Sequence, residues 1–213
     1  MSFLSIVTKN AASIKKQEIN IMDEITRQLQ ESIDTKKAVL ATNLAVIRKI
    51  ADVIVTAFKN HHYLYLIGNG GSAADAQHIA GELVGRFKMN RPPLPATALT
   101  TDTSIITALA NDFGYDTCFA RQVEAMAAPG DVLVALSTSG NSQGILNAIT
   151  TAKKIGVTTI GFTGKDGGLL KDAVDFCLRI PSNNTPRVQE CHITVGHIVC
   201  AIVEKELFGT SHA

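Results

Sequence analysis

Residues 69–82 combine two kinds of chemistry in one short stretch. The segment Asn-Gly-Gly-Ser at 69–72 follows an apolar run and precedes a helix-like segment, which is the layout of a strand leading into a phosphate-binding turn. His78 and Glu82 follow four residues apart, so a helix would place both on one face. Imidazole and carboxylate groups bind metal ions or transfer protons. The stretch therefore predicts an anion site directly before a metal-binding or acid–base pair.

A second polar segment, Ser-Thr-Ser-Gly-Asn-Ser at 137–142, also follows an apolar run and precedes a helical pattern. Hydroxyl groups and free amides at a helix N-terminus suit a phosphate. By itself, such a segment is more often a polar turn, with Ser142 as the residue that caps the following helix. Two such loops after successive core strands favour phosphate binding.

The remaining elements are those needed to position these loops. Residues 18–60 contain no Gly or Pro and predict helices, with apolar residues such as Ile47, Ile50 and Ile54 on one face. Beyond residue 62, apolar runs at 63–67, 95–99, 132–136, 158–162 and 176–180 alternate with helical patterns at 73–85, 104–111, 142–155 and 168–172, before a closing helix over 188–207. This alternation predicts a three-layer α/β/α sandwich with a central five-stranded parallel sheet, preceded by an N-terminal helical hairpin.

Length and composition narrow the classes of function. The chain has 213 residues, enough for one α/β domain, and we expect an N-terminal extension over 1–17 and a single domain over 18–213. A net charge of +1 gives no long-range field for nucleic acid or an anionic membrane, so neither is an expected partner. The four cysteines have no CxxC spacing, and residues 1–20 lack a secretory signal pattern, so we expect a cytoplasmic protein.

Together, the two loops resemble those of the sugar isomerase (SIS) domain family and, within it, of the phosphoheptose isomerases. The similarity runs from about residue 18 to the C-terminus. It includes the segments at 77–82, 85–87, 90–92, 110–114, 163–168 and 187–192. Each segment is a weak signal when taken singly, whereas the joint match is highly specific.

The resemblance implies the SIS fold, a sugar-phosphate substrate, one zinc ion per subunit and a homotetramer with active sites at subunit contacts. The implied reaction converts sedoheptulose 7-phosphate to D-glycero-D-manno-heptose 7-phosphate through an enediol, as the first step of ADP-heptose or GDP-heptose biosynthesis. By position, the implied substrate-binding residues are Asn69, Gly70, Gly71, Ser72, Glu82, Asn111, Asp112, Ser137, Thr138, Ser139, Ser142 and Gln189. The implied zinc ligands are His78, Glu82, Gln189 and His197, and the proton transfers fall to Glu82 and His197.

The chemistry of these residue types agrees with the resemblance. Converting a 2-ketose to an aldose moves a proton between two carbons, which needs one base at carbon and a second group at the oxygens. We expect Glu82 to be the base and His197 the acid/base, with zinc organising the site. Without the resemblance, His78 would be read as a core histidine and Glu82 as a solvated helix residue. We expect His192, unlike His197, to have a packing role.

Two other functions compete with the isomerase. One is a non-catalytic binding protein of the same fold, similar to the DnaA initiator-associating protein. That relative shares the Gln-His and Arg-Ile-Gln-Glu stretches but lacks the Glu and the final His, whereas this chain keeps Glu82 and His197. The other is a sugar-phosphate-sensing regulator, which is disfavoured because no DNA-binding segment is recognisable. The sequence therefore favours the enzyme.

Overall fold

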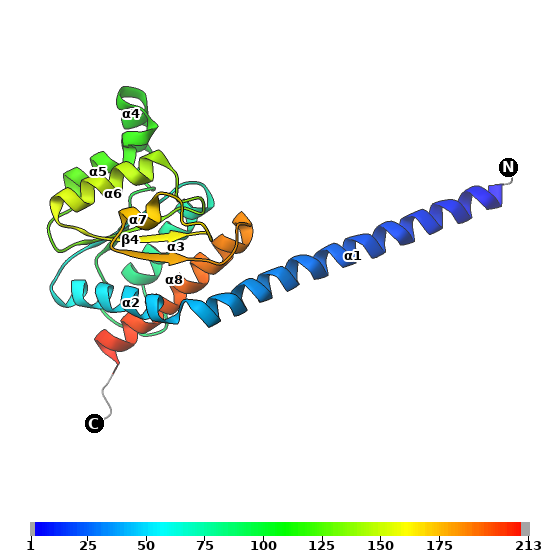
Figure 1. Cartoon of the computed structure of the whole chain (residues 1–213), viewed down its shortest axis with the longest axis horizontal. Coiled ribbons are helices and arrows are strands. Elements are labelled where there is room, and N and C mark those ends of the chain that lie inside the picture. The colour runs from blue at the N-terminus through cyan, green and yellow to red at the C-terminus, as the bar shows by residue number, and fades with distance from the viewer. Residues whose placement is uncertain (1–2, 210–213) are drawn as a thin grey trace.

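The computed structural model describes residues 3–209, with side chains from residue 21 onward, and is built around a single parallel sheet (Figure 1). The strands are arranged in the order β2-β1-β3-β4-β5, and every neighbouring pair is parallel. Their bounds are β1 Leu64–Gly68, β2 Ala96–Ala98, β3 Val132–Leu136, β4 Thr158–Thr163 and β5 Phe176–Arg179. The predicted five-stranded parallel sheet is confirmed.

Helices cover both faces of this sheet. The helices are α1 Phe3–Thr42, α2 Leu44–Lys59, α3 Gly71–Val84, α4 Thr103–Phe113, α5 Cys118–Met126, α6 Gln143–Ile155, α7 Leu170–Ala173 and α8 Thr185–Phe208, with a 3-10 turn at Tyr115–Thr117. One core cluster joins the sheet to α2, α3 and α8, and the other joins it to α5, α6 and α7. The central strands β1 and β3 are buried along their whole length, as a sheet covered on both faces requires.

The N-terminal helices differ from the predicted hairpin. Only Asn43 separates α1 from α2, and its backbone is near-helical at φ −112° and ψ −1°. One such residue cannot reverse the chain, since a helical hairpin needs a loop of about 2–5 residues. In Figure 1, α2 continues the general course of α1, which extends away from the sheet. The hairpin was therefore wrong, although the helices themselves were correctly predicted.

Helix α5 was missed from the sequence. It had no counterpart among the predicted helices, because its nine residues are too few for a clear period. The predicted boundary between an extension over 1–17 and a domain over 18–213 falls inside α1 and stays a prediction, and residues 1–2 and 210–213 lie outside the described part. Among the described residues, no helix combines the length and apolar character that a membrane crossing requires.

The strand order determines where a ligand can bind. The chain passes from β1 to β2 on one side, and then to β3 on the other side of β1. In open parallel sheets, ligands bind beyond the carboxyl ends of the strands at such a reversal. The two polar loops of the sequence directly follow β1 and β3, so the topology brings them together at this point.

Candidate active site

The turn after β1 is shaped by its glycines. A β-carbon on Gly68 would lie 2.5 Å from the backbone oxygen of Ser72, so a larger residue there would push the turn away from the strand. Gly70 has φ +56°, a left-handed conformation that favours glycine. Helix α3 begins at the next residue, and no side chain of the described residues caps its N-terminus. The turn thus presents a helix N-terminus at the sheet edge, where an anion is stabilised.

The loop after β3 is joined to this turn by side chains. Asn69 Nδ2 donates to Ser142 Oγ at 3.0 Å, and Tyr115 Oη donates to Asn69 Oδ1 at 2.8 Å. Ser142 stands at the N-cap position of α6 but makes no capping hydrogen bond. The expected N-cap position of Ser142 is confirmed, but its side chain bonds to Asn69 and does not cap the helix. By contrast, the N-cap of α4 is filled by Asp102, which accepts from Ile105 N at 2.9 Å.

The chain after β4 makes backbone hydrogen bonds to the loop at residues 137–142. Gly164 N donates to Thr138 O at 3.0 Å, and Leu170 N donates to Gly140 O at 2.9 Å. Thr138 and Ser139 border a cavity of about 370 Å³, whose other lining residues are Asn141, Asp166, Gly167, Asn183 and Thr185. The loop predicted to bind phosphate is therefore held by hydrogen bonds from the chain after β4, and it borders a cavity with room for a ligand.

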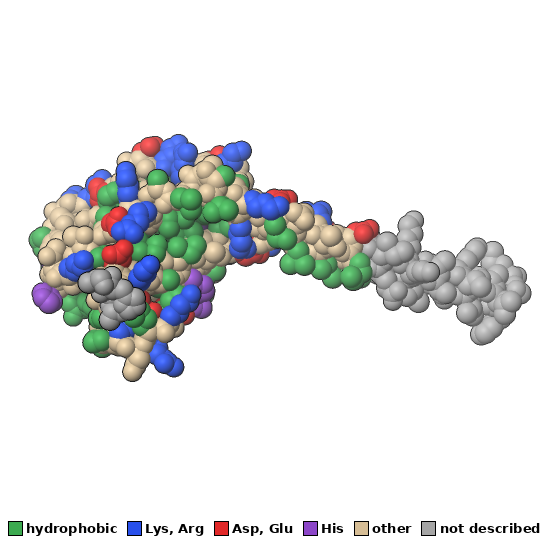
Figure 2. Space-filling view, turned by 90° about the horizontal axis from the view of Figure 1, so that it is seen from below, with side chains coloured by type: hydrophobic (Ala, Val, Ile, Leu, Met, Phe, Trp, Pro, Cys, Tyr) green, Lys and Arg blue, Asp and Glu red, His purple; other side chains and the backbone are tan. Residues whose placement is uncertain are grey.

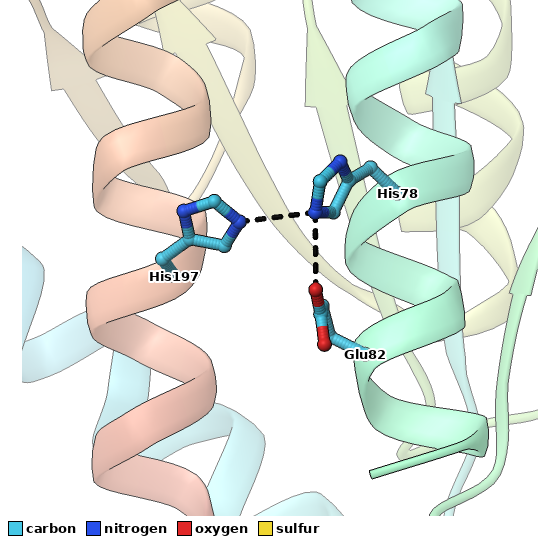
Figure 3. Close-up of side chains that lie close together, drawn as sticks. All are labelled: His78, Glu82 and His197. Atoms are coloured by element: carbon cyan, nitrogen blue, oxygen red, sulfur yellow. Dashed lines mark hydrogen bonds and ion pairs between the residues drawn. The ribbon is translucent and has the colours of Figure 1, made fainter. Parts of the chain in front are cut away.

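His78, Glu82 and His197 form a cluster between α3 and α8 (Figure 3). His78 Nε2 lies 3.0 Å from Glu82 Oε1 and 3.0 Å from His197 Nε2. His78 and Glu82 project from one face of α3, and His197 points toward them from α8 (Figure 3). The Phe87 ring stacks on the His197 ring, with centroids 5.6 Å apart and an interplanar angle of 18°. The sequence spacing and the fold thus bring both predicted acid–base residues to one point.

The donor set of this cluster fits a divalent metal ion. One ligand atom from each of the three residues lies within 4.8 Å of the others. His78 Nε2 lies near both a carboxylate oxygen and a second imidazole nitrogen. A single hydrogen on Nε2 cannot make a full hydrogen bond to both of these atoms at once. A cation between the three atoms would accept one lone pair from each of them. Two histidines and a glutamate would supply three ligands to a zinc ion, and a four-coordinate site would take its fourth ligand from another side chain, a water or the substrate.

Three other predicted residues lie elsewhere. A β-carbon on Gly71 would be 2.7 Å from Gln189 Nε2, so the Gln189 amide packs on the first turn of α3. Gln189 therefore contacts the phosphate turn, seven residues before His78 on α3, and its role as a zinc ligand stays a prediction. Asn111 and Asp112 lie on α4, which has no buried residue, and Asn111 Nδ2 donates to Asp112 Oδ1 at 2.7 Å. Among the described residues, no hydrogen bond joins either of these two to the other predicted site residues.

One feature of the site, Tyr115, went beyond the sequence signals. Tyr115 was not singled out, although it follows the matched segment at 110–114, which was the only sequence signal that could have indicated it.

His192 is fully buried, its ring packs edge-on against Phe162, and its Nε2 lies 3.3 Å from Thr163 O. Burial lowers the pKa of His192 to about 4, so it is neutral at pH 7. The expected division between a packing His192 and a clustered His197 agrees with these positions.

Comparisons with known proteins identify the class of this fold. Residues 27–164 match the family model described as SIS domain. Phosphoheptose isomerase from Roseiflexus sp. (strain RS-1) is 53% identical over 190 residues, which are 87% of this chain and 96% of that protein. Phosphoheptose isomerase from Aquifex aeolicus (strain VF5) is 49% identical over 185 residues, which are 87% of this chain and 97% of that protein.

Solved structures give the same result. The phosphoheptose isomerase from Neisseria gonorrhoeae has a TM-score of 0.83 at 37% identity, covering 87% of this chain and 99% of its own. The enzyme from Francisella tularensis has a TM-score of 0.84 at 36% identity, covering 86% of this chain and 98% of its own. The chain therefore belongs to the SIS domain family and, within it, to the phosphoheptose isomerases, which are aldose–ketose isomerases.

Proposed function

We propose that this isomerase converts sedoheptulose 7-phosphate to D-glycero-D-manno-heptose 7-phosphate, and thereby begins ADP-heptose or GDP-heptose biosynthesis. The observation that carries the proposal is the arrangement of the phosphate loops and the His78–Glu82–His197 cluster along one pair of helices. Gln189 of α8 lies beside Gly71 of α3, and His197 of α8 lies beside His78 of α3. The two helices therefore run in the same direction from the phosphate turn to the cluster.

This arrangement suits a long sugar phosphate. Ser72 precedes His78 by six residues, which is about 9 Å along a helix axis. A phosphate held at the N-termini of α3 and α6 would let an extended sugar chain direct its far end, C1 and C2, toward the cluster. A carbon chain of several atoms is needed to span that separation. The geometry thus favours a sugar whose phosphate and carbonyl lie at opposite ends.

The proposed proton transfers use Glu82 and His197. Glu82 removes a proton from C1 of the ketose, and His197 donates a proton to the C2 oxygen, which gives the enediol. Glu82 then returns a proton to C2 while His197 accepts the proton of the C1 hydroxyl, which leaves the aldehyde. Both groups end in their starting protonation states, as a catalytic cycle requires. The alternative of a non-catalytic binding protein gives no reason for Glu82 and His197 to converge.

A zinc ion would be held by His78, Glu82 and His197, with Gln189 as the predicted fourth ligand. When bound, it would polarise the oxygens of the substrate. The test is isothermal titration of the metal-free protein with Zn²⁺, where one ion per subunit is expected and His78→Ala should remove it. Equal binding by the variant would contradict this assignment.

The reaction is tested by NMR of the purified protein with sedoheptulose 7-phosphate. A heptose 7-phosphate aldose should appear, and in D₂O it should carry deuterium at C2 because the enediol exchanges its proton with solvent. Phosphate-sugar binding without any product would instead support the non-catalytic binding protein. Product formation without deuterium at C2 would contradict an enediol whose proton exchanges with solvent.

We also propose a homotetramer, supported by an apolar row along α1. Figure 2 shows this row on the part of α1 that extends from the domain. Its members are about half exposed or more: Ile21, Met22, Ile25, Leu29 and Ile33, followed by Leu40 and Leu44 at the junction with α2. An exposed apolar face of this length is typical of an interface, and a second copy of the chain would cover it. Leu29→Asp should lower the mass measured by light scattering, whereas Lys37→Asp, outside this row, should not.

The same proposal accounts for Asn111 and Asp112. Helix α4 extends from the body of the domain (Figure 1), has no buried residue, and exposes Ile105 and Phe113. In a tetramer, α4 would present Asn111 and Asp112 to the active site of a neighbouring subunit. Asp112→Asn should then impair turnover, and mixing it with Glu82→Gln should restore part of the activity. No recovery in mixed tetramers would place Asp112 in its own subunit's site or outside any site.

We propose a cytoplasmic location because all four cysteines, Cys118, Cys177, Cys191 and Cys200, are free thiols. Free thiols persist in a reducing compartment. Fractionation of cells that produce the protein tests this, and recovery in the periplasmic fraction would contradict it.

A further inference from the structure

A buried ion pair joins α8 to the segment that follows α3. The side chains of Arg91 and Glu204 are 1% and 2% exposed, and Arg91 Nε lies 3.0 Å from Glu204 Oε1. The Glu204 carboxylate also accepts from three consecutive backbone amides, those of Phe87 at 2.9 Å, Lys88 at 2.8 Å and Met89 at 3.1 Å. Burial acts to raise the pKa of Glu204, but the three amides and Arg91 hold it below its ordinary value. The carboxylate is therefore charged and fully partnered.

The Arg91 guanidinium also donates hydrogen bonds to carbonyl groups at the C-terminal end of α3. Arg91 Nη2 donates to Glu82 O at 2.9 Å, and Nη1 donates to Leu83 O at 2.6 Å. The last carbonyls of a helix have no partner within it, and α3 ends at Val84. Gly85 has φ −77° and does not make the left-handed turn that usually caps a helix. Arg91 thus takes the place of that cap. One of the two carbonyls that it binds belongs to Glu82, the residue with the proposed catalytic carboxylate.

Glu204 also reaches the second proposed catalytic residue. It holds the backbone of Phe87, whose ring stacks on the His197 ring. Glu204 and His197 lie seven residues apart on α8, which places them on nearly the same face of that helix. One buried pair therefore contacts Glu82 through its carbonyl and His197 through Phe87.

We propose that Arg91 and Glu204 are positioning residues that set the separation of Glu82 and His197 for proton transfer. The proposal rests on the catalytic roles proposed above for Glu82 and His197. Stability is not a sufficient reason for this pair, because apolar residues of similar volume often replace a buried ion pair without loss. Misplacement of a reacting group by about 1 Å can cost about 100-fold in rate. The phosphate loops are not contacted by either residue, so substrate affinity should not depend on the pair.

The test compares single, double and control variants at a temperature well below unfolding. Glu204→Gln leaves the Arg91 charge unpaired, and we expect a lower melting temperature, a kcat reduced about 10–100-fold and a KM within about twofold of wild type. The double variant Arg91→Met/Glu204→Gln removes both charges, so the melting temperature should recover in part while kcat stays low. Arg91→Lys keeps the charge but lacks the planar fork that serves Glu204 and both carbonyls, and should also lower kcat.

The control is Glu206→Gln on the same helix. Glu206 pairs at 3.2 Å with Arg48 on the surface, so it loses the same charge at a site remote from the cluster. It should leave kcat, KM and the melting temperature unchanged. Recovery of kcat together with stability in the double variant would show that the pair acts on folding only, and would overturn the proposal.

A second measurement separates this proposal from the proposed function. The NMR signals of the His78 and His197 ring protons should shift in Arg91→Lys and Glu204→Gln and stay unchanged in Glu206→Gln. Unmoved signals in the first two variants would overturn the positioning role. If Glu82→Gln retained full turnover, the catalytic roles would fail, whereas the ring signals would still report whether the ion pair positions the cluster.

Discussion

The phosphate loops at the sheet edge and the cluster of His78, Glu82 and His197 are held in place by different means. The loops are fixed mostly by main-chain hydrogen bonds and close glycine contacts, such as Gly164 N to Thr138 O. The cluster consists of side chains from α3 and α8. Its members His78 and His197 are 119 positions apart in the sequence. The proposed phosphate binding would therefore use mainly backbone groups, whereas the proposed proton transfer depends on how two helices pack.

This difference has a consequence for substitutions. A backbone site that loses one hydroxyl binds more weakly but keeps its other donors in place. A side-chain cluster loses its chemistry when one member changes, because no neighbouring group supplies the same base. Substitutions in the loops should therefore act on KM, and substitutions in the cluster should act on kcat.

The largest effect is expected at Glu82. Glu82→Gln keeps the shape of the side chain and removes the base, so kcat should fall about 10²–10⁴-fold, the usual contribution of general base catalysis. KM should change little, because the phosphate loops are untouched. Steady-state kinetics measures both values, with Glu124→Gln on the exposed face of α5 as the control. A large rise in KM with normal kcat would remove the distinction between the two regions.

The next effect concerns acid stability through His192, which lies on α8 between Gln189 and His197. Its pKa is about 4 in the folded protein because of burial, against about 6.5 when unfolded. Between these values the unfolded chain binds more protons, so the free energy of unfolding should fall by about 3 kcal/mol as pH drops from 6.5 to 4. Urea unfolding across this range measures the slope. His192→Gln should flatten it, and an unchanged slope would assign the acid sensitivity to other groups.

A smaller effect is expected at Ser142 in the phosphate loops. Ser142→Ala removes a hydroxyl that accepts from Asn69 and that would contact the phosphate, so KM should rise about 10–100-fold, the worth of one hydrogen bond to a charged group. Stability should hold, since Ser142 makes no capping hydrogen bond. Thr150→Ala, a hydroxyl on the exposed face of the same helix, is the control. A fall in kcat at constant KM would place Ser142 with the cluster instead.

The smallest effect is expected at Tyr115. Tyr115→Phe removes only the hydroxyl that orients the Asn69 amide, and the ring is half exposed. KM should rise about two- to fivefold, equivalent to about 0.5–1 kcal/mol for a partly exposed neutral hydrogen bond. Tyr63→Phe, at the opposite end of β1, should have no effect. Equal kinetics for Tyr115→Phe and wild type would show that Ser142 suffices to hold Asn69.

Much of the fold, and the position of the two proposed phosphate loops, was predictable because the signals are local. The apolar run at 132–136 matched β3 at both ends. Gly68 stands where a β-carbon would meet the backbone of Ser72, and Gly70 has a left-handed φ of +56°. A buried parallel strand reads as a continuous apolar run, and a turn with a left-handed residue requires glycine. Helix α5 and the course of α1 into α2 were not predictable in this way, because short helices and one-residue junctions leave little pattern.

The sequence by itself determined that His78 and Glu82 share a helix face, since four-residue spacing does so in any helix. It also determined the two polar loops, because each directly follows its strand. Only the tertiary structure decided that His197 meets that pair, that Gln189 rests on Gly71, and that Arg91 and Glu204 join the end of α3 to α8. The physical reason is that these contacts depend on the packing of helices far apart in the chain, which no local periodicity encodes.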